Sequence, residues 1–153
     1  MIPSFAKYGL LPVGIHWVTW EEFYEHFSFS PQRVRLLTGL KAALENLAQA
    51  GCTVVYLDGS FVTRKAEPSD FDGCWSGWDV DPAKLDPVLL DFSQQRQAMK
   101  EKYGGELLVA ETPADFEGRT YLDFFQAELR GKTRIRKGII AIRLGAATPE
   151  DQI

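Results

Sequence analysis

The chain has 153 residues, of which 45% are hydrophobic and 25% are charged, and this composition is that of an ordinary soluble protein with one core. Its net charge of −4 excludes a protein that coats nucleic acid by charge alone, but it leaves room for a local basic site. The sequence opens without the charged segment and following apolar segment of a signal peptide. No apolar run comes near the length of about 18 residues that a membrane-spanning helix needs. We therefore expect a single domain over 1–153, located in the cytoplasm and without a membrane partner.

The N-terminal part of the chain predicts an irregular segment and then a short helix. Proline and glycine interrupt residues 1–18, so no regular element is expected there. Thr19 and Glu22 have the spacing of a capping box, in which each side chain bonds the other residue's backbone N–H. This spacing predicts a helix over 20–27.

A longer helix is predicted directly after the first. Ser30 is a favourable N-cap residue, and Pro31 suits the first helical position. Gly51 is expected just past the last turn, where glycine commonly ends a helix. Leucines spaced three and four residues apart give this helix one apolar stripe, at Leu37, Leu40, Leu44 and Leu47.

The rest of the chain alternates between strand and helix patterns. Residues 53–57 form a nearly continuous apolar run with β-branched and aromatic residues, which is typical of a buried strand. The remaining expected elements are a strand over 71–75, two helices or one broken helix over 82–92 and 94–103, a strand over 106–110, a loop over 113–119, a helical pattern over 121–129, a strand over 135–144 and a loose tail over 145–153. This order predicts an α/β (α+β) fold in which helices pack on a mixed sheet.

The two cysteines, Cys52 and Cys74, each fall at or inside a predicted strand. Two are too few for the disulfide framework of a small secreted domain, and no pair of Cys or His residues has the spacing of zinc ligands. We expect both to be buried free thiols.

Two acidic residues at the start of the predicted strand over 71–75 point to a cation. Asp70 and Asp72 are two residues apart, so on a strand they share one face at a separation of about 7 Å. Two carboxylates so placed repel each other unless a proton or a cation lies between them. Mg²⁺, or Mn²⁺ in its place, suits this position because it prefers oxygen ligands. The alternative is that both are turn or strand-edge residues without a ligand, since Ser-Asp is common loop chemistry.

The segment before these acids has the chemistry of a phosphate-binding turn. Gly59 lets the backbone approach a ligand closely, and Ser60 adds a hydroxyl beside free backbone N–H groups. Arg64 and Lys65 follow within the same loop and would neutralise phosphate charge. These four residues are the predicted nucleotide-binding residues.

Taken together, Leu57-Asp58-Gly59-Ser60, nine further residues and Asp70-Phe71-Asp72 resemble the signature of the nucleotidyltransferase superfamily, which includes DNA polymerase beta and the minimal nucleotidyltransferases. The resemblance implies a nucleotidyltransferase-like domain in which the Gly-Ser pair contacts the phosphates of a nucleoside triphosphate and the paired acids hold Mg²⁺. Gly73 departs from the signature, which prefers an apolar residue there.

A third catalytic acid, which the superfamily carries on a later strand, is not obvious in this chain. The candidates are Glu106, Glu111 and Asp115. Glu111 ends the apolar run over 107–110 and is therefore the expected third catalytic residue beside Asp70 and Asp72.

Three segments, 11–16, 56–65 and 137–140, resemble a family of small bacterial proteins of unknown function. That resemblance covers nearly the whole chain and implies a nucleotidyltransferase-like fold, with a connection to toxin–antitoxin or phage-defence systems. It does not imply an established activity.

The segment over 130–137 concentrates five positive charges. Arg130, Lys132, Arg134 and Arg136 alternate with other residues and would share one face of an extended strand. Such a stripe would bind a triphosphate or an RNA acceptor. The alternative is a solvated loop or a charged edge that discourages sheet-to-sheet association.

These features predict an Mg²⁺-dependent nucleotidyltransferase, which moves a nucleoside monophosphate to a hydroxyl of an RNA, a protein or a small molecule and has a toxin-like role. The alternative is a module of the same fold that binds a nucleotide or neutralises a cognate partner protein without catalysis. A third carboxylate that reaches Asp70 and Asp72 would favour the enzyme.

Overall fold

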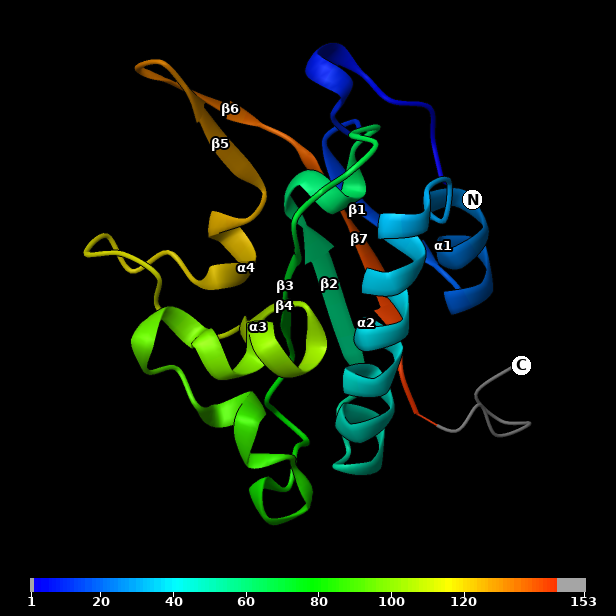
Figure 1. The fold of residues 1–153 in the computed structure, drawn as a ribbon. Coiled ribbons are helices and arrows are strands. Elements are labelled where there is room, and N and C mark those ends of the chain that lie inside the picture. The colour runs from blue at the N-terminus through cyan, green and yellow to red at the C-terminus, as the bar shows by residue number, and fades with distance from the viewer. Residues whose placement is uncertain (1, 146–153) are drawn as a thin grey trace, which may run out of the picture.

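The computed structural model describes residues 2–145, which form an α+β fold with a five-stranded mixed sheet and a separate two-stranded hairpin (Figure 1). The order of strands in the main sheet is β1-β7-β2-β3-β4. Its strands are β1 (Gly14–Val18), β2 (Val54–Asp58), β3 (Phe71–Trp75), β4 (Gly105–Val109) and β7 (Gly138–Arg143). The hairpin consists of β5 (Ala127–Arg130) and β6 (Thr133–Arg136). The predicted fold class, helices packed on a mixed sheet, is confirmed.

The strand directions place the C-terminal end of β2 beside the N-terminal end of β3. β2 lies antiparallel to both β7 and β3, whereas β1 runs parallel to β7 and β4 runs parallel to β3. Because β2 and β3 are antiparallel, the C-terminal end of β2 meets the N-terminal end of β3. The Gly-Ser turn and the two aspartates therefore lie at the same end of the sheet.

The helices α1 (Trp20–Phe27) and α2 (Pro31–Gln49) pack on one face of the sheet (Figure 1). The capping box of Thr19 and Glu22 is present, and Ser30 caps α2. Gly51 follows the C-cap of α2 with φ of 101°, as the sequence predicted. The predicted leucine stripe of α2 is buried against sheet residues that include Leu57, Phe71 and Ile140.

Four predictions of elements need correction. The segment over 1–18 is not irregular throughout, because its last part is strand β1. The segment over 82–96 forms short 3₁₀ turns, and only α3 (Gln97–Tyr103) is an α-helix. The helical pattern over 121–129 is a single turn, α4 (Tyr121–Phe124), followed by β5. The strand expected over 135–144 is two strands, β6 and β7, which are separated at Lys137.

Hydrogen bonds from backbone N–H groups to aspartate side chains explain the first two 3₁₀ turns of the segment over 82–96, at Pro82–Lys84 and Pro87–Leu90. Asp81 accepts a bond from the N–H of Ala83, and Asp86 accepts one from the N–H of Val88. Each acid precedes a proline that begins its turn, so both turns are capped locally and end within four residues. These caps compete with a continuous helix.

Cys52 and Cys74 are buried and free, as predicted.

Within residues 2–145, no helix combines the length and apolar character that crossing a bilayer requires. Of the tail predicted over 145–153, residues 146–153 lie outside the described part of the chain.

Candidate functional site

Three carboxylate residues form a row across the main sheet. Asp58 on β2 pairs in register with Asp72 on β3, and Asp72 pairs in register with Glu106 on β4. Residues paired in this way point to the same face of a sheet. Their neighbours Leu57 and Phe71 belong to the core beneath α1 and α2, so the three acids lie on the opposite face. We call Asp58, Asp72 and Glu106 the carboxylate row.

Asp72 lies in the middle of the carboxylate row and is the most perturbed of its members. Burial raises the pKa of Asp72 to about 7, and the nearby charges of Asp70, Glu106 and Asp58 add to this increase. The pKa of Asp70 is also raised, first by burial and then by Glu106. The two predicted metal ligands therefore share one electrostatic environment, which would favour a bound cation.

Lys137 holds Asp58, the carboxylate at one end of the row. The Nζ of Lys137 lies 3.2 Å from Oδ1 of Asp58 and 3.4 Å from Oε1 of Glu128. Burial of Asp58 raises its pKa to about 6, although the charge of Lys137 opposes the increase. Asp58 and Asp72 thus both hold a proton more strongly than an exposed aspartate does.

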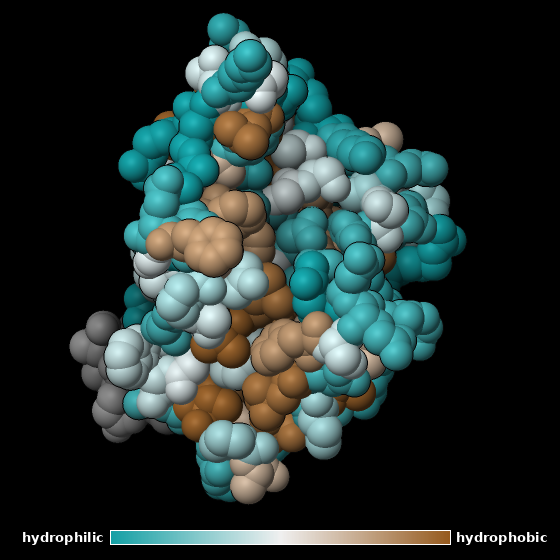
Figure 2. Space-filling model, turned by 90° about the vertical axis from the view of Figure 1, so that its left-hand side faces the viewer, coloured by the Kyte–Doolittle hydropathy of each residue, from teal (hydrophilic) through white to brown (hydrophobic). Residues whose placement is uncertain are grey.

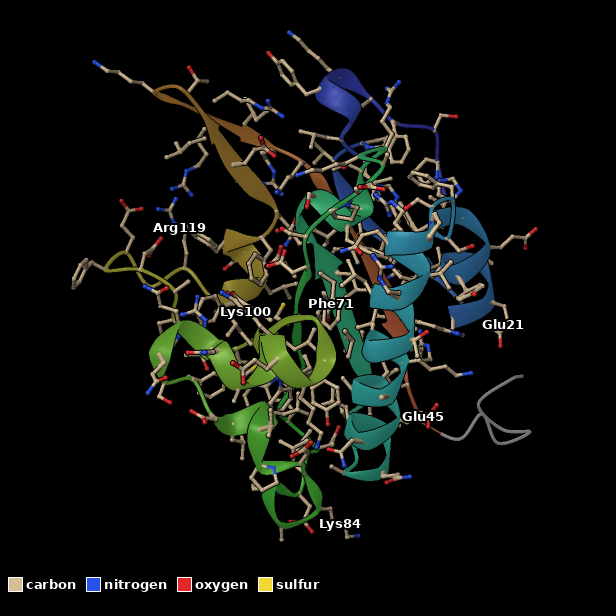
Figure 3. The ribbon with its side chains drawn as sticks, viewed as in Figure 1. Glu21, Glu45, Phe71, Lys84, Lys100 and Arg119 are labelled. Carbon is tan, nitrogen blue, oxygen red and sulfur yellow. The ribbon has the colours of Figure 1, made fainter. Side chains whose placement is uncertain are left out.

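Lys100 and Arg96 hold Glu106, the carboxylate at the other end of the row. Glu106 forms ion pairs with Lys100 at 2.9 Å and with Arg96 at 3.3 Å. Figure 3 shows Lys100 on α3, which packs beside the sheet. Among residues 2–145, no such ion pair involves Asp70 or Asp72, although the charges of Lys65 and Lys100 act on Asp70 and the charge of Lys137 acts on Asp72.

Gly59 places the Gly-Ser turn directly against Asp72. The turn is a 3₁₀ turn over Gly59–Val62, and Gly59 adopts φ of 75°, where side chains are disfavoured. A Cβ at this position would lie 2.5 Å from Oδ2 of Asp72. The predicted turn and the predicted acid pair therefore occupy one place in the fold.

A buried arginine that the sequence analysis missed holds this turn in position. Arg33 on α2 is fully buried, and burial lowers the pKa of its guanidinium to about 10. All five guanidinium N–H groups are used. Their acceptors are the carbonyl oxygens of Phe27, Ser60, Phe61, Thr63 and Lys65.

Aromatic rings surround the same guanidinium, which lies 4.1 Å from the ring centroid of Phe29 and 4.7 Å from that of Phe61. The sequence did carry a signal for this residue. Arg33 precedes Leu37 by four residues and Leu40 by seven, so it extends the apolar stripe of α2.

The two predicted phosphate-neutralising residues lie in different directions from the turn. The guanidinium of Arg64 lies 5.7 Å from the ring centroid of Phe5 and packs beside Gly9, in the N-terminal segment. Lys65 is exposed, and its charge opposes the increase in the pKa of Asp70. The structure thus brings Lys65 toward the acids and directs Arg64 away from them.

A pocket of about 370 Å³ opens beside the carboxylate row, between the sheet and the β5–β6 hairpin. Asp58 and Asp72 form its acidic side. The other lining residues come from α4, the hairpin and the residues next to them, namely Phe124, Phe125, Ala127, Glu128, Leu129, Arg134 and Lys137. The pocket combines an apolar wall, carboxylates and two cations, which is the lining expected of a site for a small polar ligand.

Glu111 does not join the two aspartates, contrary to our expectation. It follows β4 by two residues and lies five residues beyond Glu106, toward the opposite end of the sheet. There its Oε1 accepts a hydrogen bond of 2.7 Å from the N–H of Gly77.

Of the other two candidate acids, one lies away from Asp72 and one lies beside it. Asp115 forms an ion pair with Arg119 in its own loop. Glu106 is the register neighbour of Asp72. Of the three candidate acids, only Glu106 is beside Asp72.

Asp70 and Asp72 offer two oxygen donors, which are the kind of ligand that Mg²⁺ prefers. Within residues 2–145, no group of three or more His, Cys, Asp or Glu side chains is arranged to hold a metal ion by itself. Mg²⁺ is commonly bound by one or two carboxylates together with substrate phosphates and water. Asp70 and Asp72 provide two carboxylates, so the remaining ligands would come from the substrate and from water.

Comparisons with known proteins identify one family. No curated protein and no solved structure matches the chain. The model of a family of unknown function, DUF6932, matches residues 3–143, which is most of the chain. The protein therefore belongs to the family of unknown function DUF6932.

Proposed function

We propose that the protein is an Mg²⁺-dependent nucleotidyltransferase, which transfers a nucleoside monophosphate from a nucleoside triphosphate to a hydroxyl group. The observation that carries this proposal is the contact between the Gly59 turn and Asp72, in the middle of a row of carboxylates. The resemblance to nucleotidyltransferases requires these two parts to meet.

Each part of the site has a role in this reaction. Asp70 and Asp72 would hold Mg²⁺ or Mn²⁺ together with the triphosphate, and the turn at Gly59 and Ser60 would receive the phosphates. The bound ion would neutralise the charge that develops on the transferring phosphate. Arg33 holds the carbonyl groups of the turn and so fixes where its N–H groups point.

The bond changes are those of an in-line displacement. The acceptor hydroxyl oxygen forms a bond to the α-phosphorus, and the bond between this phosphorus and the oxygen that bridges to the β-phosphorus breaks. Pyrophosphate leaves with the electron pair of that bond, and a carboxylate of the row accepts the hydroxyl proton. We assign the third acidic position to Glu106 in place of Glu111, because Glu106 is the register neighbour of Asp72.

The ion pairs of the row favour a second candidate, a module that binds a nucleotide or a partner protein without catalysis. Asp58 is held by Lys137, and Glu106 is held by Lys100 and Arg96. If these pairs persist when a nucleotide binds, Glu106 has no free carboxylate for a reaction.

Transfer of label from α-³²P nucleoside triphosphates separates the two candidates. The protein is incubated with each of the four triphosphates, Mg²⁺ and bulk RNA, alone and with a protein extract. We expect label in a macromolecule with the wild type, none with the Asp70→Asn/Asp72→Asn variant, and wild-type labelling with Glu111→Gln as the matched control. Nucleotide binding without transfer under Mg²⁺ or Mn²⁺ would support the module instead.

A toxin-like role belongs to the same proposal and rests on the resemblance alone. Induced expression of the wild type in a bacterial host should slow growth, and expression of the Asp70→Asn/Asp72→Asn variant should not. Equal growth of both cultures would contradict the toxin-like role without affecting the transferase.

A further inference from the structure

The β5–β6 hairpin presents two arginines on the side of the pocket. Arg134 pairs in register with Leu129, and Arg136 pairs with Ala127, so these four residues share one face of the hairpin. We call Ala127, Leu129, Arg134 and Arg136 the hairpin face. All of them except Arg136 line the pocket that contains Asp72.

The expectation that four alternating cations share one face is wrong. The chain reverses between β5 and β6, and Arg130 pairs in register with Thr133, on the side of the hairpin opposite to Arg134 and Arg136. Lys132 lies in the turn itself, between the two strands. The stripe predicted from a single extended strand is therefore divided by the hairpin.

The remaining cations of the hairpin are available to a ligand. Lys132, Arg134 and Arg136 are exposed, and no carboxylate of residues 2–145 forms an ion pair with any of them. Arg130, in contrast, is 2.8 Å from Glu128, and its guanidinium lies 4.4 Å from the ring centroid of a tyrosine in the N-terminal segment. The free charges are thus those on the hairpin face and at the hairpin turn.

The charge distribution of the whole chain argues against a merely solvated edge. The chain carries a net charge of −4, and the five cations over 130–137 leave −9 for the rest of the sequence; two of the five, Arg130 and Lys137, are already paired with carboxylates. A local positive surface on an acidic protein attracts polyanions to one place and repels them elsewhere. The free cations of this surface therefore favour a polyanionic ligand over a neutral one.

Apolar side chains lie beside these cations. Leu129 is 66% exposed and Phe124 is 44% exposed, although both line the pocket. Figure 2, which views the molecule from the side of the hairpin, shows apolar side chains gathered along the middle of this face between hydrophilic margins. An exposed ring such as that of Phe124 beside cations suits an unpaired base, which stacks on the ring while its phosphate binds arginine.

We propose that the hairpin face binds a single-stranded polynucleotide, and that a terminal hydroxyl of this strand is the acceptor in the pocket. The part that concerns the acceptor rests on the proposed transferase function, whereas binding of the strand does not. The phosphates contact Arg134 and Arg136 on the hairpin face and Lys132 at the hairpin turn, and the end of the strand reaches Asp72 along the pocket that Arg134 lines. The hydroxyl oxygen at that end forms the new bond to the α-phosphorus, its proton goes to a carboxylate of the row, and pyrophosphate leaves.

Fluorescence anisotropy tests the binding of the strand. The probes are a labelled oligouridylate and a labelled oligothymidylate of about 12 nucleotides, a length within the usual range of single-strand sites. They are titrated with the full chain in EDTA at several salt concentrations. We expect binding that weakens with salt, and the two probes show whether the strand must be RNA. A duplex of the same length that binds equally well, or no binding of either probe, would overturn the proposal.

A charge-reversal variant tests the surface. Lys132→Glu/Arg136→Glu changes two cations that do not line the pocket. We expect at least a tenfold loss of affinity and a salt dependence that is shallower by about 1.4 in log–log slope, because about 0.7 counterions are released per contacted phosphate. The matched control is Lys41→Glu/Lys84→Glu, which makes the same charge change elsewhere; Lys84 lies at the opposite end of the molecule from the hairpin (Figure 3). An equal loss in the control would overturn the proposal.

A milder variant and a second readout keep these outcomes interpretable. Lys132→Gln/Arg136→Gln removes the same charges without reversing them, so it should show a smaller loss of affinity and the same shallower salt dependence. Urea unfolding reports the fold of each variant. A neutralised variant that is folded and binds with the wild-type salt dependence would overturn the role of the hairpin face.

The double aspartate variant separates this proposal from the transferase. Asp70→Asn/Asp72→Asn should still bind the strand but should not label it. Strand binding by the wild type without any transfer would overturn the transferase function and the acceptor role that depends on it, and would leave strand binding intact. Metal-dependent triphosphate binding without strand binding would overturn only the role of the hairpin.

Discussion

The turn at Gly59 depends on a residue without a side chain. Its φ of 75° is costly for other residues, and a Cβ there would press on the carboxylate of Asp72. We expect Gly59→Ala to lower the free energy of unfolding by about 1–3 kcal/mol and to weaken triphosphate binding. Urea denaturation and calorimetric titration measure these two effects.

Gly118→Ala is the matched control for this substitution. Gly118 has φ of 81°, but a Cβ there would have no neighbour within 4 Å. It therefore shares the backbone cost and lacks the contact with Asp72. Equal effects of the two substitutions on triphosphate binding would contradict the role of the Gly59 turn.

Arg33 is expected to be irreplaceable even by another cation. Lysine has three donors on one nitrogen and cannot satisfy the five carbonyl groups that the planar guanidinium reaches. Arg33→Lys should therefore cost about 2–4 kcal/mol of stability, as measured by urea unfolding. Arg35→Lys, at an exposed position on the same helix, should change stability by less than about 0.5 kcal/mol. Similar costs at the two positions would contradict this account of Arg33.

Among the elements, those with local signals in the sequence were predicted and those that depend on distant partners were not. The caps at Thr19 and Ser30 and the glycine at Gly51 lie beside the helices that they delimit, so they could be recognised directly. Strand β1 exists because residues 14–18 pair with 138–142, more than a hundred residues later. No local pattern reveals such a partner, and the prolines and glycines of this segment suggested a loop.

The same distinction applies to the candidate site. The Gly59 turn and Asp72 are separated by few residues, and their arrangement follows from an antiparallel pair of neighbouring strands. The choice of Glu106 over Glu111 depends on the register of β3 against β4, which the sequence does not specify. Arg33 was missed because a charged residue on a helix usually faces water.

The contact between the N-terminal segment and β7 provides a test at the scale of an element. Gly138 begins β7, and a Cβ at Gly138 would overlap the carbonyl oxygen of Pro12. Gly138→Ala must therefore move the N-terminal segment away from the sheet, and we expect a loss of about 3 kcal/mol or more in urea unfolding. A Cβ at Gly131 would have open space around it, so Gly131→Ala should cost only the strain of its positive φ. A loss no larger than that of Gly131→Ala would contradict this packing.

At the scale of the whole molecule, the buried carboxylates make stability depend on pH. The pKa of Asp72 is about 7 in the folded protein, against an ordinary value of about 4 in the unfolded chain. The folded state then binds more protons between these values, so the contribution of Asp72 is fully present below about pH 4 and is lost as the pH rises through about 7. Asp58, with a pKa of about 6, acts in the same direction.

We expect Asp72→Asn to remove part of this pH dependence. In EDTA, the free energy of unfolding of the variant relative to the wild type should increase by about 1–3 kcal/mol between pH 4 and pH 8. Urea denaturation across this range measures the difference, and Mg²⁺ with a triphosphate should reduce it at pH 8 by stabilising the wild type. A difference that does not change with pH would show that Asp72 ionises normally.

Calorimetric titration with the four nucleoside triphosphates tests the central claim, that the Gly59 turn and the Asp70–Asp72 pair form one metal-dependent nucleotide site. The account predicts that at least one triphosphate binds in Mg²⁺ or Mn²⁺, that EDTA abolishes this binding, and that Asp70→Asn/Asp72→Asn loses it while Glu111→Gln retains it. Binding that is equal with and without metal, or unchanged in the double variant, would contradict the account.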